Sequence, residues 1–179
     1  VWGSWSVTRA WLRHGGPDML RLWKYHPDHG RIVFLKHGLP SRLGGRGFVH
    51  PDGFHRGPDG RVYLSSDEGV LFRMNPDSDT PEKIGKPGPH TRLSAFANGP
   101  NGKLYGAAGR DQTTMIFSYD PRTGEMIDHG SIQDADTGER PSQVHDMTLF
   151  PDGTIYAGEN DHPQRASFLW EVNGVVSRK

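Results

Sequence analysis

The sequence contains no cysteine, no long apolar run and no excess of charge of either sign. Without cysteine there is no disulfide, no thiolate metal ligand and no cysteine nucleophile, although the cellular compartment stays open. No apolar stretch approaches the roughly 18 residues that would cross a bilayer. The 21 basic residues balance the 21 acidic ones, so we expect neither nucleic acid nor a membrane surface as a partner.

Hydrophobic residues are also scarce, at 33% of 179 residues, whereas glycine (24) and proline (14) are abundant. This composition is typical of short strands joined by turns, and the regular spacing of the aromatic residues argues against disorder. The chain begins at Val1 without an initiator methionine, so we expect a processed or truncated start. Among the compartments left open, we favour secretion or the periplasm.

A six-residue pattern occurs four times along the chain. Each copy has Leu or Ile, an aromatic residue, a polar residue and a second apolar residue, and then a turn. The copies are LWKYHP (22–27), LFRMNP (71–76), IFSYDP (116–121) and LWEVNG (169–174). Side chains two residues apart share one face of a strand. A recurrence every 45 to 53 residues is typical of propeller blades.

A second pattern alternates with the first. It occurs as GPDGRVY (57–63), GPNGKLY (99–105) and FPDGTIY (150–156). Asp-Gly or Asn-Gly between apolar runs predicts a tight hairpin. Together the two patterns predict units of four antiparallel strands, A to D, with a hairpin between A and B and a proline turn between C and D.

We therefore predict an all-β fold, a single β-propeller portion of about four four-stranded blades. The approximate blade boundaries are 1–47 (partial), 48–90, 91–142 and 143–179. The first blade lacks an A strand, and the last has at most the beginning of a D strand. We favour part of a ring of six to eight blades, which missing blades or a second chain would complete, over a closed four-bladed ring.

These repeats resemble the broad propeller group that contains NHL-repeat and gluconolactonase-type proteins, and the resemblance covers essentially the whole chain. The sequence is also similar to propeller-type polysaccharide lyases. The resemblance implies that functional residues lie in the D–A and B–C connections, on one face of the disc. Such lyases commonly use a tyrosine as the acid.

Histidine and arginine are abundant in those connections. Arginine can hold a carboxylate through two parallel hydrogen bonds, and a neutral histidine can accept a proton. This pair suits β-elimination from a uronate sugar, and hence an acidic or hydroxyl-rich saccharide as partner. Our candidate bases are His145 and His50. Our candidate substrate-binding residues are His55, His90, Arg92, Asp146, Arg110 and Arg165. Arg13, His14 and Arg46 lie in the same kinds of connection.

Each candidate also has a structural interpretation. The pair His145 and Asp146 can hydrogen-bond a neighbouring blade, and Arg165 can pair with Glu159 or Asp161 inside its own loop. All five tyrosines fall at repeat positions in strands, so a second histidine, or a tyrosine outside these blades, would have to supply the acid.

Two other classes stay open. A gluconolactonase-type hydrolase would need a divalent cation such as calcium, with oxygen ligands from Glu159, Asn160 and Asp161 and Asp146 or Asp52 nearby. For the lyase, which is the class we favour, we assign no metal ligand. A non-catalytic binding or assembly module is the third class, and Trp2, Trp5 and Trp11 near the N-terminus are the residues that would favour it.

Overall fold

The computed structural model describes residues 1–4, 21–42 and 48–175. These residues form small antiparallel sheets and one short 3-10 helix, η2 (Pro27–His29). The predicted all-β fold is confirmed. No helix in the described part of the chain is long and apolar enough to cross a membrane.

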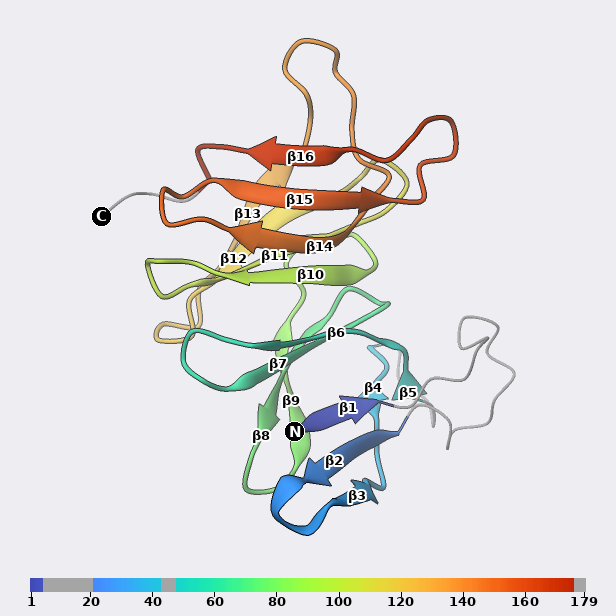
Figure 1. Ribbon diagram of the computed structural model, residues 1–179, viewed down its shortest axis with the longest axis vertical. Coiled ribbons are helices and arrows are strands. Elements are labelled where there is room, and N and C mark those ends of the chain that lie inside the picture. Colours follow the sequence, from blue (N-terminus) through green and yellow to red (C-terminus); the bar gives the residue numbers. More distant parts are fainter. Residues whose placement is uncertain (5–20, 43–47, 176–179) are drawn as a thin grey trace.

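Four sheets follow one another along the chain, and we name them blades 1 to 4 (Figure 1). Blade 1 contains β1 (Trp2–Ser4), β2 (Leu22–His26) and β3 (Arg31–Phe34). Blade 2 contains β6 (Pro51–Arg56), β7 (Val62–Ser66), β8 (Leu71–Asn75) and β9 (Thr80–Gly85). Blade 3 contains β10 (Leu93–Asn98), β11 (Leu104–Ala108), β12 (Met115–Tyr119) and β13 (Met126–Ser131). Blade 4 contains β14 (Gln143–Leu149), β15 (Ile155–Asn160) and β16 (Leu169–Val172). A small sheet of β4 (Leu39–Pro40) and β5 (Phe48–Val49) lies between blades 1 and 2 in the sequence.

Strand order within each blade is the order along the chain, and neighbouring strands are antiparallel. In blade 1, β1 pairs with the C strand β2, as expected for a B strand. The hairpin turns form where the Asp-Gly and Asn-Gly pairs predicted them. Gly60, Gly102 and Gly153 all have positive φ, which glycine adopts without a side-chain clash. Asp59 and Asn101 each accept a hydrogen bond from the backbone two residues later.

Three apolar clusters hold successive blades together. Between blades 1 and 2 the cluster is Leu22, Leu39, Val49, Leu64, Val70, Phe72 and Met74. Between blades 2 and 3 it is Tyr63, Leu71, Leu93, Phe96, Leu104, Ala108, Met115, Phe117 and Tyr119. Between blades 3 and 4 it is Ala95, Ala97, Tyr105, Ala107, Ile116, Ile132, Val144, Met147, Ile155, Ala157 and Trp170. The repeated aromatic residue (Phe72, Phe117 or Trp170) thus packs on the preceding blade, and burial of each ring stabilises the stack by roughly 1.5–3 kcal/mol.

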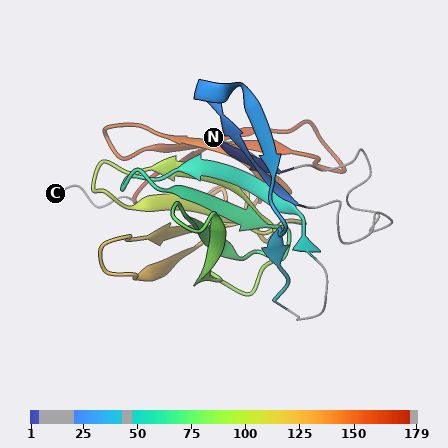
Figure 2. The same ribbon diagram turned by 90° about the horizontal axis from the view of Figure 1, so that it is seen from below.

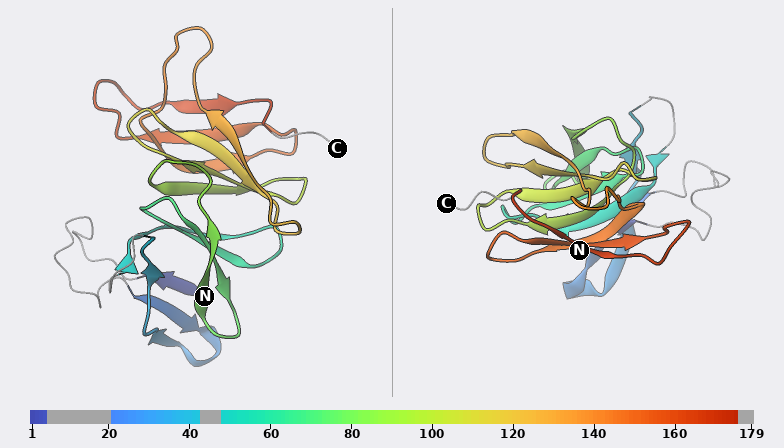
Figure 3. Two further views of the ribbon diagram at one scale, coloured as in Figure 1. Left: turned by 180° about the vertical axis from the view of Figure 1, so that it is seen from behind. Right: turned by 90° about the horizontal axis from the view of Figure 1, so that it is seen from above.

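The A strands β6, β10 and β14 lie side by side, one above the other in Figure 1. Figure 2 views the stack from the blade 1 end, and Figure 3 shows it from behind and from above. Each A strand has a β-bulge at the same repeat position, where one residue is added opposite its B strand. The added residues are Asp52, Ser94 and His145. A bulge re-aims the side chain at that point, and here all three bulges lie near the start of their strands.

Candidate functional site

Two repeat positions carry a chain of polar contacts across blades 2, 3 and 4. The first position, at or just before the start of each A strand, holds His50, Arg92 and Gln143. The second is the bulge, two residues later, and its Asp52 and His145 take part in the chain. We name these five residues, His50, Asp52, Arg92, Gln143 and His145, the polar chain.

Arg92 is the centre of the polar chain. Its Nε donates to Asp52 Oδ2 at 3.3 Å and its Nη2 to Asp52 Oδ1 at 3.2 Å, so the pair is bidentate. Its Nη1 donates to Gln143 Oε1 at 3.2 Å. The Asp52 side chain is only 3% exposed, and His50 Nδ1 lies 3.6 Å from its Oδ1. Arg92 therefore joins an acidic group of blade 2 to an amide of blade 4.

The backbone of Arg92 has an unusual conformation. Its φ is 59°, a left-handed value that residues other than glycine adopt at an energetic cost. Its N–H donates to Asp67 O at 2.9 Å, and its carbonyl accepts from Gly109 N at 2.9 Å. These two B–C loops thus hold the conformation from both sides. Strain of this kind is concentrated at functional sites.

His145 is at the other end of the polar chain, and 42% of its side chain is exposed. Its Nε2 contacts the side-chain nitrogen of Gln143 and lies 4.0 Å from Asp161 Oδ2. Asp161 follows β15 and also has a left-handed backbone, with φ of 59°. The candidate base is thus accessible and lies between an amide donor and a carboxylate.

Three other predicted residues lie on the same face as the polar chain. His90 precedes Arg92, and its carbonyl packs so closely on Gly69 that a Cβ there would be 2.4 Å from the oxygen. Arg110 belongs to the B–C loop of blade 3, is 57% exposed and forms an ion pair of 3.4 Å with Asp111. Asp146 accepts a hydrogen bond from Met147 N at 2.9 Å and is exposed.

His55 lies apart from the polar chain. It is near the end of β6, next to the A–B hairpin, whereas Asp52 is near the start of that strand. Its Nε2 contacts Asn98 Oδ1 at 3.1 Å, and its ring lies 5.8 Å from that of Phe96. The structure therefore gives His55 a contact between blades 2 and 3, and its role in substrate binding stays a prediction.

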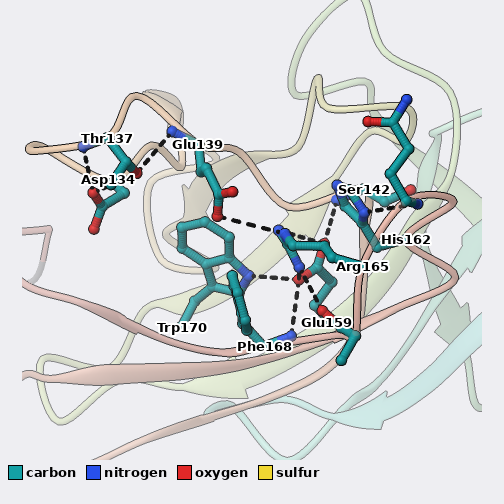
Figure 4. A network of polar contacts seen from close by, with 11 residues as sticks. Asp134, Thr137, Glu139, Ser142, Glu159, His162, Arg165, Phe168 and Trp170 are labelled. Atoms are coloured by element: carbon teal, nitrogen blue, oxygen red, sulfur yellow. Dashed lines mark hydrogen bonds and ion pairs between the residues drawn. The ribbon is translucent and has the colours of Figure 1, made fainter.

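Arg165 belongs to a buried network in blade 4 (Figure 4). Its Nη1 donates to Glu159 Oε2 at 2.7 Å and its Nη2 to Glu159 Oε1 at 3.2 Å. Its Nε forms an ion pair of 3.4 Å with Glu139, and its guanidinium lies 3.8 Å from the ring centre of Phe168. Glu139 comes from the β13–β14 connection, which extends from the top of the molecule in Figure 3.

Glu159 also accepts hydrogen bonds from Ser142 N at 2.8 Å, Phe168 N at 2.9 Å and Trp170 Nε1 at 3.2 Å. Burial alone would raise the pKa of this carboxyl, but Arg165 and the other donors outweigh burial and lower the pKa to about 2. Because Ser142 directly precedes Gln143, the carboxylate fixes the start of β14. Arg165 thus has the pairing that its structural interpretation anticipated, and contact with substrate stays a prediction for it.

The residues of the hydrolase alternative do not fit a metal ion. Both oxygens of Glu159 already accept hydrogen bonds from protein donors. Within residues 1–4, 21–42 and 48–175, no group of three or more His, Asp and Glu side chains is placed to hold a metal. We therefore derive no step through a cation.

The tyrosine hydroxyls of the B strands lie at the hairpin end of the blades. Tyr63 donates to Asp59 Oδ2 at 3.0 Å, and Tyr105 accepts from Asn101 Nδ2 at 2.9 Å. Burial, together with Asp59, raises the pKa of Tyr63. These groups are remote from the starts of the A strands, so neither can serve as an acid beside His145.

Sequence reasoning missed Gln143, because an uncharged amide was not among the residue types considered for catalysis. The repeat itself carried the signal, since Gln143 aligns with His50 and Arg92. Some earlier candidates, namely Arg13, His14, Arg46, Trp5 and Trp11, lie outside the described residues.

No family model matches the chain, and no curated protein matches it. Solved structures do match at the level of fold. Virginiamycin B lyase from Staphylococcus aureus is 13% identical with a TM-score of 0.56, over 87% of this chain and 49% of that one. A proposed 6-phosphogluconolactonase from Bacteroides uniformis is 16% identical with a TM-score of 0.53, over 88% of this chain and 48% of that one. A chain of the mitotic checkpoint complex is 14% identical with a TM-score of 0.58, over 87% of this chain and 42% of that one.

At such identities the likeness shows the fold alone, and the propeller class predicted from the repeats is confirmed. The gluconolactonase-type resemblance has a counterpart among these structures, whereas none of the three is a polysaccharide lyase. The chain spans about half the length of the two enzymes.

Proposed function

We propose that these blades belong to a propeller lyase that cleaves a C–O bond by β-elimination, with the polar chain as its acid–base site. One observation carries the proposal: the two candidate bases, His50 and His145, stand at the two ends of a single chain of contacts through Arg92. The lyase among the structural neighbours supports it, and a histidine-to-alanine variant of that enzyme, captured with quinupristin, is catalytically inactive.

The substrate class that we propose is a uronate-containing saccharide. Three of the five N–H groups of Arg92 are used by Asp52 and Gln143, which leaves two for a substrate carboxylate. Asp52 already balances the charge of Arg92, and Asp111 balances that of Arg110, so the two remaining N–H groups of Arg92 stabilise the substrate carboxylate through charge-assisted hydrogen bonds. Neutralising the carboxylate makes the neighbouring C–H more acidic, which is the condition for elimination.

In this mechanism His145 takes the proton from the carbon beside the carboxylate. The electron pair of that C–H bond becomes the second bond of a C=C double bond, and the C–O bond to the next sugar breaks. The electron pair of the broken bond leaves with the oxygen, and His50 donates the proton that this oxygen needs. General acid–base catalysis of this kind contributes typically 10²–10⁴-fold to a rate.

A second candidate function is hydrolysis of a lactone, favoured by the proposed 6-phosphogluconolactonase among the neighbours. The same His145 would then activate a water molecule in place of a carbon acid. The two candidates differ in their products, since hydrolysis adds water and elimination does not.

The test uses the complete protein and a panel of uronate polysaccharides, quinupristin and a gluconolactone. Elimination from a uronate creates a conjugated double bond, so ultraviolet absorbance should rise with that substrate. His145→Ala should reduce the rate at least 10²-fold while the circular dichroism spectrum and melting temperature stay unchanged. His29→Ala, in the exposed turn of η2, is the matched control and should retain turnover. Full activity of His145→Ala would remove His145 from the mechanism.

A further inference from the structure

The geometry points to Gln143 as a positioning residue that determines which ring nitrogen of His145 carries the proton. Its amide oxygen contacts Arg92 and its amide nitrogen contacts His145 Nε2. The amide therefore has different partners on its two sides. Nothing in the repeat pattern required a glutamine at this place.

The orientation of the Gln143 amide follows from the chemistry of Arg92. A guanidinium has only N–H donors and no acceptor, so the group that faces Nη1 must be the amide oxygen. A flipped amide would place its NH₂ group against the guanidinium, donor to donor. Arg92 itself cannot turn away, because Asp52 holds it through two hydrogen bonds. The NH₂ group of Gln143 therefore faces His145.

An NH₂ group donates, so His145 Nε2 must accept. A ring nitrogen that accepts a hydrogen bond carries no proton, and the ring proton of neutral His145 then lies on Nδ1. Asp52, Arg92 and Gln143 thus form a chain of hydrogen bonds, which we name the relay. It links a buried carboxylate in blade 2 to the exposed imidazole in blade 4. The relay keeps Nε2 as the unprotonated nitrogen of the resting protein.

The surroundings of His145 also provide for the protonated ring. Asp161 Oδ2 lies 4.0 Å from the same Nε2, and a carboxylate attracts an imidazolium. Asp146 directly follows His145 in the sequence, and its Oδ1 accepts a hydrogen bond from the backbone N–H of Met147. Once Nε2 gains a proton, the amide of Gln143 becomes a repulsive neighbour and Asp161 an attractive one. This catalytic consequence rests on the proposed function, whereas the placement of the proton does not.

The experiment is nitrogen NMR of the complete protein with ¹⁵N-labelled histidine. The His145 signals are identified by their absence from the His145→Ala spectrum. At a pH where the imidazole is neutral, we expect Nδ1 to show the ¹⁵N chemical shift of a protonated nitrogen and Nε2 that of an unprotonated one. The reverse assignment in the wild-type protein would overturn the inference directly.

Gln143→Glu tests the cause. A carboxylate at this position accepts a hydrogen bond instead of donating one, so the proton of His145 should move to Nε2. Gln112→Glu makes the same substitution at an exposed loop residue and should leave the spectrum unchanged. If His145 keeps its proton on Nδ1 in Gln143→Glu, Gln143 does not determine the tautomer. If turnover is lost in Gln143→Glu while the spectrum is unchanged, the relay is contradicted and the proposed function is not.

Discussion

At the scale of single residues, the carboxylate of Glu159 accepts hydrogen bonds from four residues of blade 4, Ser142, Arg165, Phe168 and Trp170. Its side chain is fully buried, and charged and neutral donors surround both oxygens. Removing one partner of a buried ion pair costs more than the pair itself contributes, because the other charge is left unpaired. The start of β14, and with it Gln143 and His145, depends on this group through Ser142.

Glu159→Gln should therefore lower stability in a pH-dependent way. The pKa of Glu159 is lowered from 4.5 to about 2, so its stabilisation is complete above pH 4.5 and is lost as the pH falls towards 2. The shift corresponds to a free energy of unfolding on the order of 3 kcal/mol. Denaturant unfolding of both proteins from pH 7 down to pH 2 should show a gap of this order that closes in acid.

Glu125→Gln is the control for this measurement, since Glu125 is 60% exposed and lies 3.7 Å from Lys103. An exposed pair of this kind contributes roughly 0–1 kcal/mol. A gap between wild type and Glu159→Gln that is small, or that does not change with pH, would contradict the assigned network.

At the scale of strands and turns, a glycine before the A–B hairpins of blades 2 and 3 makes room for a tyrosine. A Cβ on Gly57 would lie 2.4 Å from the ring of Tyr63, and one on Gly99 would lie 2.5 Å from Tyr105. Blade 4 has Phe150 at this position, and there the ring of Tyr156 meets Phe150 edge to face at 5.3 Å. Tyr156 is accordingly less buried than the other two tyrosines.

Gly99→Ala should destabilise the protein by roughly 1–3 kcal/mol, the usual cost of overpacking. Gly85→Ala is the matched control, because a Cβ there would lie 3.7 Å from Met126 Cε, an ordinary contact. Thermal unfolding of the two variants measures the difference. Equal melting temperatures would mean that the Tyr105 ring can move aside at no cost.

The strands, hairpins and core positions could be predicted from the sequence, because they follow from spacing within one repeat. Phe72, Phe117 and Trp170 recur at a fixed place, and the period alone indicates that they are core. The bulges at Asp52 and His145 could not be predicted, because a bulge depends on the register between two strands. The contact of Arg92 with Gln143 also crosses from one blade to the next, over 51 residues of sequence, and no local pattern encodes it.

At the scale of the whole molecule, the stack has two faces with large exposed apolar side chains. On blade 1, Ile32 is 52% exposed and Phe34 is 57% exposed. Both lie in β3, opposite the aromatic residues Tyr25 and Trp23 of β2. On blade 4, Leu169 is 71% exposed. Its repeat equivalents, Leu71 and Ile116, are buried in the clusters with the following blade.

We propose that a further blade of the same repeat covers Leu169, as blades 3 and 4 cover the equivalent residues. This is the ring completion by further blades or a second chain that the sequence led us to expect, and we commit to blades of the longer polypeptide as the source. The structural neighbours, about twice as long, favour that source. A ring so completed would also bring further residues to the polar chain.

Leu169→Asp tests this proposal in the complete protein. If a blade covers the position, burying an unpaired carboxylate should destabilise the protein by several kcal/mol. If the position is open to water, the change should stay within about 0.5 kcal/mol, as in the surface control Gln112→Asp. The second result would show that no blade packs there.

The central claim is that the polar chain carries out elimination, and the mass of the products tests it most directly. The complete protein would be incubated with a uronate oligosaccharide that it cleaves, chosen without regard to absorbance, and the masses of the products would be measured by mass spectrometry. The account predicts that the masses of the two fragments add up to that of the substrate, and that His145→Ala yields neither fragment. A sum larger by one water molecule would contradict elimination and establish hydrolysis instead.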